Sequence, residues 1–319
     1  MTIRSPRVAL GLLLLVSLVW GVEFVLIDLA VARIPTHTFN AIRFALAALS
    51  LLPLLWFSRE RLPQGQVQKL LGAGLLLGFM LFVGFYTQTE GLRFTSVSNA
   101  GFITGLNVPL VPVLGFLLFR HHASRNVWFG VLAATTGLYL LTSGEGVSLA
   151  LNQGDLLVLI CAFAFATHIV LTGRLVKQLP VILLSIVQLL AVALYSSLAA
   201  WLSPDPAFYH PEAAAVQWQD QLLAPMILLA ILVASILGTA YAFWAQSACQ
   251  TLLPAHKVAL VFAFEPVFAH LSAWFYLDEH LGSSGLLGAG LILSGMLISE
   301  LGDRRKASVK PLDHSATVD

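Results

Sequence analysis

Charged residues and cysteines are both scarce in this chain of 319 residues. Only 10% of its side chains are Asp, Glu, Lys or Arg, against about 25% in a typical soluble domain. Seventeen basic and sixteen acidic residues give a net charge of +1 without a basic stripe, so we expect no nucleic-acid partner. Two cysteines are too few for a disulfide framework or a cysteine-based zinc site.

Catalytic and nucleotide-binding motifs are missing as well. The sequence contains no His-Glu-x-x-His zinc motif, no Gly-x-Ser-x-Gly nucleophile elbow and no Walker phosphate loop. We therefore expect no enzyme activity, no bound metal and no cofactor. Any energy for uphill work would have to come from an ion gradient or a partner protein.

Long apolar runs are what the chain has in abundance. Hydrophobic residues make up 58% of it, and the mean hydropathy is +0.86. A bilayer core of ~30 Å needs about 20 apolar residues per helix, and none of the runs alternates as barrel strands do. Ten runs are near that length: 8–30, 36–57, 68–90, 97–119, 126–142, 154–173, 180–202, 222–246, 256–277 and 282–301. The sequence predicts an all-α membrane protein with ten transmembrane helices in the lipid bilayer.

Basic residues gather on one side of this predicted membrane. With the N-terminus in the cytoplasm, fourteen of the seventeen Lys and Arg residues lie inside, and the outer loops collect acids such as Glu145, Asp205 and Glu212. Cytoplasmic loops carry such an excess of Lys and Arg. We therefore expect a multi-pass protein of the cytoplasmic (inner) membrane with both termini in the cytoplasm.

The two halves of the chain resemble each other. Trp56 matches Trp201 at an offset of 145 residues, and Gly137 matches Gly295 at an offset of 158. Five helices per copy is an odd number, so the second copy would enter the membrane inverted. Inverted repeats around a midplane site are typical of secondary transporters. The expected organisation is a first five-helix repeat over 1–148, an inverted repeat over 149–302 and a disordered cytoplasmic tail over 303–319.

Three short motifs stand out from the apolar background. They are Trp20-Gly21 with Ala41-Ile42-Arg43-Phe44 downstream, the run from Gln88-Thr89-Glu90-Gly91 to Leu106, and Phe264-Glu265-Pro266-Val267, which leads through Asp278-Glu279 to Gly295. In this order they resemble the EamA-type ten-helix carriers of the drug/metabolite transporter superfamily. The resemblance covers nearly the whole chain and implies an exporter or permease for amino acids, other small metabolites or drugs. Many such carriers have a small polar residue or Asn where this chain has Glu23, and His121-His122 stand where the second half has Asp278-Glu279.

Glu23 and Arg43 are ionisable residues inside predicted helices. In a bilayer each would be unfavourable by at least ~2.5–3.5 kcal/mol unless it faced a cavity or a partner. Both lie seven residues from the outer end of their helix, which places them about 10 Å below the surface. This matched depth predicts an ion pair. The pair either neutralises two buried charges and nothing more, or also takes part in moving a proton.

The offset of 145 residues carries the same pair into the second half. Glu23 falls on His168, and Arg43 falls on Gln188. A buried histidine can relay protons, line the pathway, or be a satisfied packing residue, and the sequence leaves these alternatives open.

Glu265 and Asn107 stand beside prolines in the middle of predicted helices. Pro266 follows Glu265, and Pro109 and Pro112 follow Asn107. Paired proline-broken helices at corresponding positions indicate a transport site. The two polar side chains would then line the central cavity, or would only satisfy the backbone groups that the prolines leave free.

Amides and aromatic rings complete the candidate site. Gln246 belongs to a polar stripe of the eighth predicted helix, near Trp244, and Tyr86 follows Phe82 in the third. Arg43, Asn107, Gln188 and Gln246 are candidate contacts for a zwitterionic or carboxylate ligand. Glu23, His168 and Glu265 are the candidate protonatable groups. The predicted substrate-binding residues are Glu23, Arg43, Tyr86, Asn107, His168, Gln188, Trp244, Gln246 and Glu265.

Together these features favour a secondary transporter that exports small organic metabolites by alternating access, with proton coupling as a further hypothesis. A passive facilitator or channel is one alternative, and a membrane sensor or assembly protein without transport activity is another. Matched glycines in the fifth and tenth predicted helices indicate close packing or an oligomer face, so a homodimer is also a hypothesis.

Overall fold

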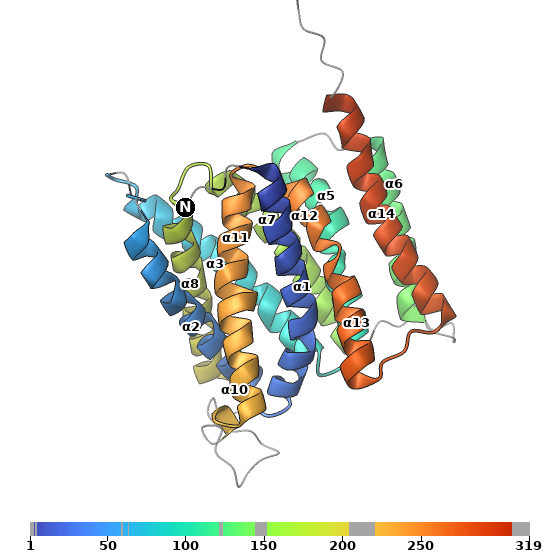
Figure 1. Ribbon diagram of the computed structural model, residues 1–319, viewed down its shortest axis with the longest axis horizontal. Helices are drawn as coiled ribbons and strands as arrows, with labels where there is room; N and C mark the ends of the chain where they lie inside the picture. The colour runs from blue at the N-terminus through green and yellow to red at the C-terminus, as the bar shows by residue number, and fades with distance from the viewer. Residues whose placement is uncertain are drawn as a thin grey trace, which may run out of the picture.

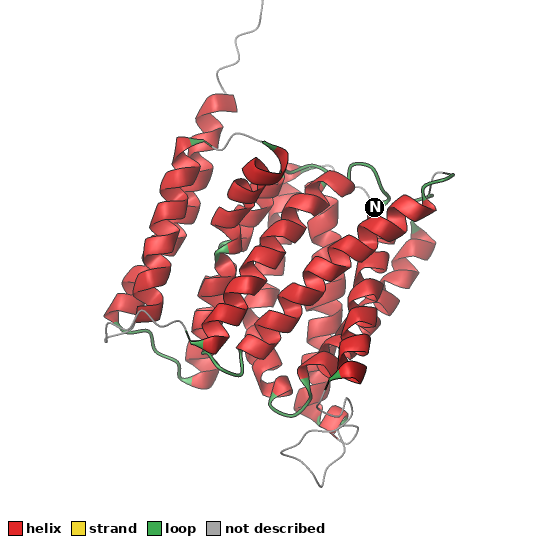
Figure 2. Cartoon of the chain, turned by 180° about the vertical axis from the view of Figure 1, so that it is seen from behind, coloured by secondary structure: helices red, strands yellow, loops and turns green. Residues whose placement is uncertain are grey.

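The chain is a helical membrane protein. The computed structural model describes residues 3, 5–58, 60–62, 64–120, 124–143, 152–203 and 221–307. All regular secondary structure in those ranges is helical (Figure 2). Eight helical stretches among them are long and apolar enough to cross a membrane.

The helices follow the predicted order (Figure 1). The first half contains α1 (Pro6–Val31), α2 (Thr36–Phe57), α3 (Val67–Gly91), α4 (Val97–Gly105), α5 (Asn107–Phe119) and α6 (Arg125–Ser143). The second contains α7 (Gln153–Leu175), α8 (Val181–Leu202), α10 (Pro225–Leu232), the π-helix η2 (Val233–Tyr241), α11 (Ala242–Gln250), α12 (Ala255–Phe262), α13 (Glu265–Leu277) and α14 (Ser283–Ala307).

The predicted tail needs a correction at its start. Residues 303–307 were expected to be disordered, but α14 continues through them to Ala307. The polar residues after 302 predicted disorder. A helix that extends beyond the apolar layer can nevertheless carry charged residues on every face. The rest of the tail, the 148/149 boundary, the His121-His122 pair and the outer acids Glu145, Asp205 and Glu212 lie outside the described residues.

Two membrane-crossing stretches are broken near their middle. The first breaks at Leu106, between α4 and α5, and the second breaks after Phe262, between α12 and α13. Proline cannot donate a backbone hydrogen bond and clashes with the preceding turn, which accounts for breaks beside Pro109 and Pro266. The prediction of two proline-broken helices is confirmed.

Glycines let several helices approach closely. A Cβ built on Gly78 of α3 would meet the carbonyl oxygen of Gln188 in α8 at 2.7 Å, and one on Gly137 of α6 would meet the backbone nitrogen of Ile292 in α14 at 2.8 Å. Small residues at helix crossings permit this distance between backbones in membranes. The glycines of α6 and α14 therefore pack these two helices against each other at one edge of the bundle (Figure 1).

Polar contacts tie the helices together at the end of the bundle that lies opposite both the N-terminus and the end of α14 (Figure 1). Glu279 accepts hydrogen bonds from the backbone nitrogens of Val97 and Ser98, at 3.0 and 2.9 Å, and from Ser98 Oγ at 2.6 Å. Thr95 donates to Asp155 Oδ1 at 2.6 Å. Residues from the second half thereby hold the start of α4.

Candidate functional site

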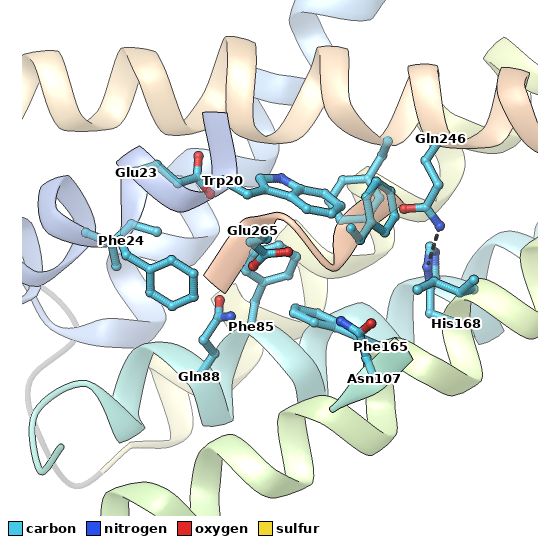
Figure 3. Close-up of a pocket in the computed structure, with 14 residues that line it drawn as sticks. Trp20, Glu23, Phe24, Phe85, Gln88, Asn107, Phe165, His168, Gln246 and Glu265 are labelled. Carbon is cyan, nitrogen blue, oxygen red and sulfur yellow. Dashed lines mark hydrogen bonds between the residues drawn. The ribbon is translucent and has the colours of Figure 1, made fainter. Parts of the chain in front are cut away.

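A pocket lies where α1, α3, α5, α7, α11, α12 and α13 meet (Figure 3). It encloses about 460 Å³ of empty space, including its opening. Aromatic rings, carboxylates and amides line it together with one imidazole: Trp20, Glu23, Phe24, Ile27, Phe85, Gln88, Asn107, Phe165, His168, Ile169, Phe243, Gln246, Phe262 and Glu265. Five of the nine predicted site residues belong to this set, namely Glu23, Asn107, His168, Gln246 and Glu265.

The predicted ion pair between Glu23 and Arg43 is confirmed. Arg43 Nη2 donates to Glu23 Oε1 at 2.6 Å, and the two side chains are 0% and 4% exposed. Arg43 Nε donates to Thr239 Oγ1 at 2.7 Å, and the guanidinium lies 4.6 Å from the ring centre of Phe85. Arg43 is not among the lining residues, so Glu23 stands between the guanidinium and the pocket.

The π-helix η2 fits closely around this pair. Trp20 Nε1 donates to the carbonyl oxygen of Gly238 at 2.7 Å, and a Cβ built on Gly238 would collide with the Glu23 carboxylate. Short π-helical segments inside α-helices often occur at functional sites. Here η2 supplies the Thr239 hydroxyl to Arg43 and makes room for Glu23.

His168 forms the corresponding contact in the second half. Its Nε2 lies 2.9 Å from Gln188 Oε1, and its Nδ1 lies 3.5 Å from Gln246 Nε2 (Figure 3). An amide oxygen can only accept, so His168 Nε2 is the donor and Nδ1 is the acceptor, which describes a neutral ring. Gln188 is fully buried behind His168 and does not line the pocket.

Asn107 and Glu265 open the second segment of each broken helix, as the first residues of α5 and α13. Asn107 Oδ1 is buried without a hydrogen-bond partner. Glu265 is only 4% exposed, and in the described part of the chain neither an ion pair nor a hydrogen bond reaches its carboxylate. No hydrogen bond joins either side chain to the backbone at the described breaks, and both line the pocket.

Tyr86 and Trp244 lie away from the pocket. The Tyr86 ring stacks on His37, with 4.3 Å between ring centres, and unlike its neighbour Phe85 it does not line the pocket. Trp244 packs beside Tyr241, 6.4 Å between ring centres. The expectation that both line the same site as Gln246 and Glu265 does not match their placement.

Most of the aromatic lining was not predicted. Trp20 and Ile27 lie three residues before and four residues after Glu23 on one face of α1, and Phe24 lies four residues after Trp20. Phe165 and Phe243 precede His168 and Gln246 by three residues. The helical spacing of these aromatic residues from Glu23, His168 and Gln246 could therefore have identified them. Gln88, which also lines the pocket, is the first residue of one of the sequence motifs.

Metal-binding geometry does not occur in the described ranges, where no group of three His, Cys, Asp or Glu side chains could hold an ion. Cys161 and Cys249 are free and buried. The site's chemistry is that of carboxylates, amides and rings around a small cavity.

Comparison with known proteins points to one family. The model of the EamA-like transporter family matches residues 7–143 and 152–301. The chain is 29% identical to an uncharacterized transporter of Archaeoglobus fulgidus over 291 residues, which is 91% of this chain and 84% of the other. It is 26% identical to a probable amino-acid metabolite efflux pump of Salmonella typhimurium over 309 residues, 94% and 97% of the two chains. A solved crystal structure with 18% identity has a TM-score of 0.69 and covers 95% of this chain and 99% of its own, which supports the fold.

Proposed function

Since this chain belongs to the EamA-like transporter family, we propose that it is a secondary transporter that exports small organic metabolites across the cytoplasmic membrane by alternating access. Its relatives are named transporters and efflux pumps, not enzymes. Amino acids and compounds derived from them are the first substrates to test, because of the names of the Salmonella protein and its Escherichia coli counterpart.

One observation carries the proposal: a buried pocket lies at two helix breaks and contains polar groups that the protein itself does not satisfy. Asn107 and Glu265 occupy corresponding positions at these breaks. Polar groups inside a membrane bundle are expensive unless they serve a pathway. Broken helices beside a midplane site are the arrangement that secondary transporters use.

We also propose ten membrane-crossing helices arranged as two inverted repeats, over 1–148 and 149–302. Several helices support this by their lengths. α2 and α8 each have 22 residues and are 145 positions apart, whereas α5 and α13 each have 13 residues and are 158 apart. Both α5 and α13 end on a left-handed residue, Arg120 and Asp278. The contacts are paired as well, since α1 packs on α13 and α7 packs on α5.

Proton coupling is the third part of the proposal. Glu23 has Arg43 as its partner and His168 has Gln188. Glu265 has no such side-chain partner among the described residues. Of the three groups it is therefore the best candidate to bind a proton that is exchanged for substrate.

The test is transport by the purified protein in liposomes. Metabolites that accumulate in cells lacking the gene would be loaded, and their movement would be measured with and without a proton gradient. We expect movement that the gradient drives and that a protonophore abolishes. Transport that ignores the gradient would indicate a passive facilitator, and no movement of any compound would favour a sensor or assembly protein.

A further inference from the structure

Several residues that line the pocket carry hydrogen-bond acceptors without a partner. Glu23 Oε2 and Asn107 Oδ1 are buried and have no donor. In the part of the chain that the structure describes, the Glu265 carboxylate also lacks one. All three side chains are only 3–4% exposed, so bulk water does not replace the missing donors. A ligand that brings N–H groups would supply what these atoms lack.

Three of the donors that line the pocket are already in use. Trp20 Nε1 donates to the carbonyl oxygen of Gly238 at 2.7 Å. Gln88 Nε2 donates to Thr104 Oγ1 at 3.1 Å, and the Gln246 amide donates to a neighbouring glutamine at 3.4 Å. A ligand carboxylate, which can only accept, would find each of these groups committed to the protein.

The positive charge near the pocket is equally out of reach. Arg43 is 0% exposed, and its guanidinium is held by Glu23, by the Thr239 hydroxyl and by the face of the Phe85 ring. Arg43 Nη1 has no hydrogen-bond partner, but this atom is buried and Arg43 does not line the pocket, so a ligand there meets Glu23 and Phe85 before the guanidinium. With Arg43 paired to Glu23, Glu265 is the carboxyl group of the pocket that has no cation beside it (Figure 3).

Resting on the transport function proposed above, we infer that the pocket binds a ligand whose polar end is a protonated amine and which carries no free carboxylate. An ammonium group has three N–H donors and no acceptor, which suits Glu265 and the unpaired oxygens of Glu23 and Asn107. The rings of Phe24 and Phe85, with the other aromatic side chains, would cover an apolar body and can stabilise the cation at their faces. This replaces the expectation of a zwitterionic or carboxylate ligand.

Three compounds that share a phenyl ring but differ in the charge of their polar end test this inference. They are phenethylamine, a cation; phenylalanine, a zwitterion; and 3-phenylpropionate, an anion. Each would be offered to the protein in liposomes under the same gradient, and transport would be measured by mass spectrometry alongside a broader metabolite panel. We expect phenethylamine to be moved at least about tenfold faster than the other two, the discrimination that one charged hydrogen bond provides.

Variants of Glu265 test whether this residue causes the preference for the amine. Glu265→Gln keeps the shape of the side chain and should lower phenethylamine transport about 10- to 150-fold, whereas Glu265→Asp keeps the charge and should retain the preference for the amine. Asp278→Asn is the matched control, because Asp278 is 94% exposed and Asn tolerates its left-handed backbone. Thermal melting of each variant in detergent separates a loss of folding from a loss of transport.

Different results would overturn the inference of an amine ligand and the proposed transport function. Preferred transport of phenylalanine, of the anion, or of any anionic or zwitterionic member of the panel overturns the inference and leaves the transport function standing. Amine transport that folded Glu265→Gln does not reduce overturns the assignment to Glu265. If no compound of the panel moves, the transport function fails and the inference fails with it.

Discussion

The Glu23–Arg43 pair offers a sharp test of how the bundle is held together. Glu23→Gln leaves the Arg43 guanidinium charged at 0% exposure without a carboxylate beside it. Its remaining partners are uncharged: the new amide oxygen, the Thr239 hydroxyl and the rings of Phe44 and Phe85. Removing one member of a buried pair typically lowers stability by about 3–5 kcal/mol. We expect a loss of this size, because arginine cannot release its proton to escape burial.

The reverse variant should behave differently with pH. In Arg43→Met the Glu23 carboxyl is left alone, but it can be neutralised by taking up a proton. The folded variant then binds more protons than the unfolded chain, so its stability rises as the pH falls. Glu23→Gln has no such escape, and its loss should persist at every pH. The double variant should lose only about 1 kcal/mol, because a buried pair can often be replaced by uncharged side chains at little cost.

Unfolding in mixed detergent micelles, followed by circular dichroism at mildly acidic and mildly alkaline pH, gives the four stabilities of this cycle. A coupling of at least about 3 kcal/mol between the two positions is expected, and it grows with the loss that Arg43→Met causes. Losses that simply add in the double variant, or a Glu23→Gln protein as stable as the parent, would refute the argument that the charges need each other. In that case the pair would serve transport alone.

Two further predictions concern packing and the movement between states. Gly238→Ala places a methyl group against the Glu23 carboxylate and should lower stability by about 1–3 kcal/mol, while Gly72→Ala, which meets nothing within 4 Å, should not; equal melting temperatures would contradict the close fit. Ser98→Cys with Glu279→Cys, in a chain whose own cysteines are replaced by alanine, should lose transport when a short bifunctional thiol reagent joins the two positions. A reductant that cleaves the linker should restore transport, and unchanged transport in the cross-linked protein would show that this end need not open.

The sequence was sufficient to predict the helices and the buried polar pairs. Apolar runs of the right length give helix bounds to within four residues, except at the end of α14, which lies six residues beyond the predicted 301. Matched depth identified the contact between Glu23 and Arg43. The same offset of 145 residues identified the partners His168 and Gln188, which lie 2.9 Å apart. These predictions succeed because a polar side chain in an apolar membrane helix is stable only beside a polar partner or a cavity, and few such partners exist.

The sequence did not reveal which side of each helix points into the pocket. α3 has three aromatic residues close together, Phe82, Phe85 and Tyr86, and only Phe85 lines the pocket. In a soluble helix the polar face would decide between them, but lipid and protein interior are equally apolar. The π-helix η2 was also missed, because nothing in its sequence from Val233 to Tyr241 distinguishes it from an ordinary apolar helix.

The two polar contacts that the offset of 145 residues relates differ in charge. In the first half an ion pair joins Glu23 to Arg43, and in the second a neutral contact joins His168 to Gln188, each across 20 residues. Such asymmetry makes the two end states of a carrier unequal in energy and so changes their populations. Populations alone cannot drive export, which needs a group whose ionisation is tied to the binding of the ligand. Among the described residues of the pocket, Glu265 is the carboxyl that no side chain of the protein neutralises, so the exchange of a proton for a bound amine would be centred there.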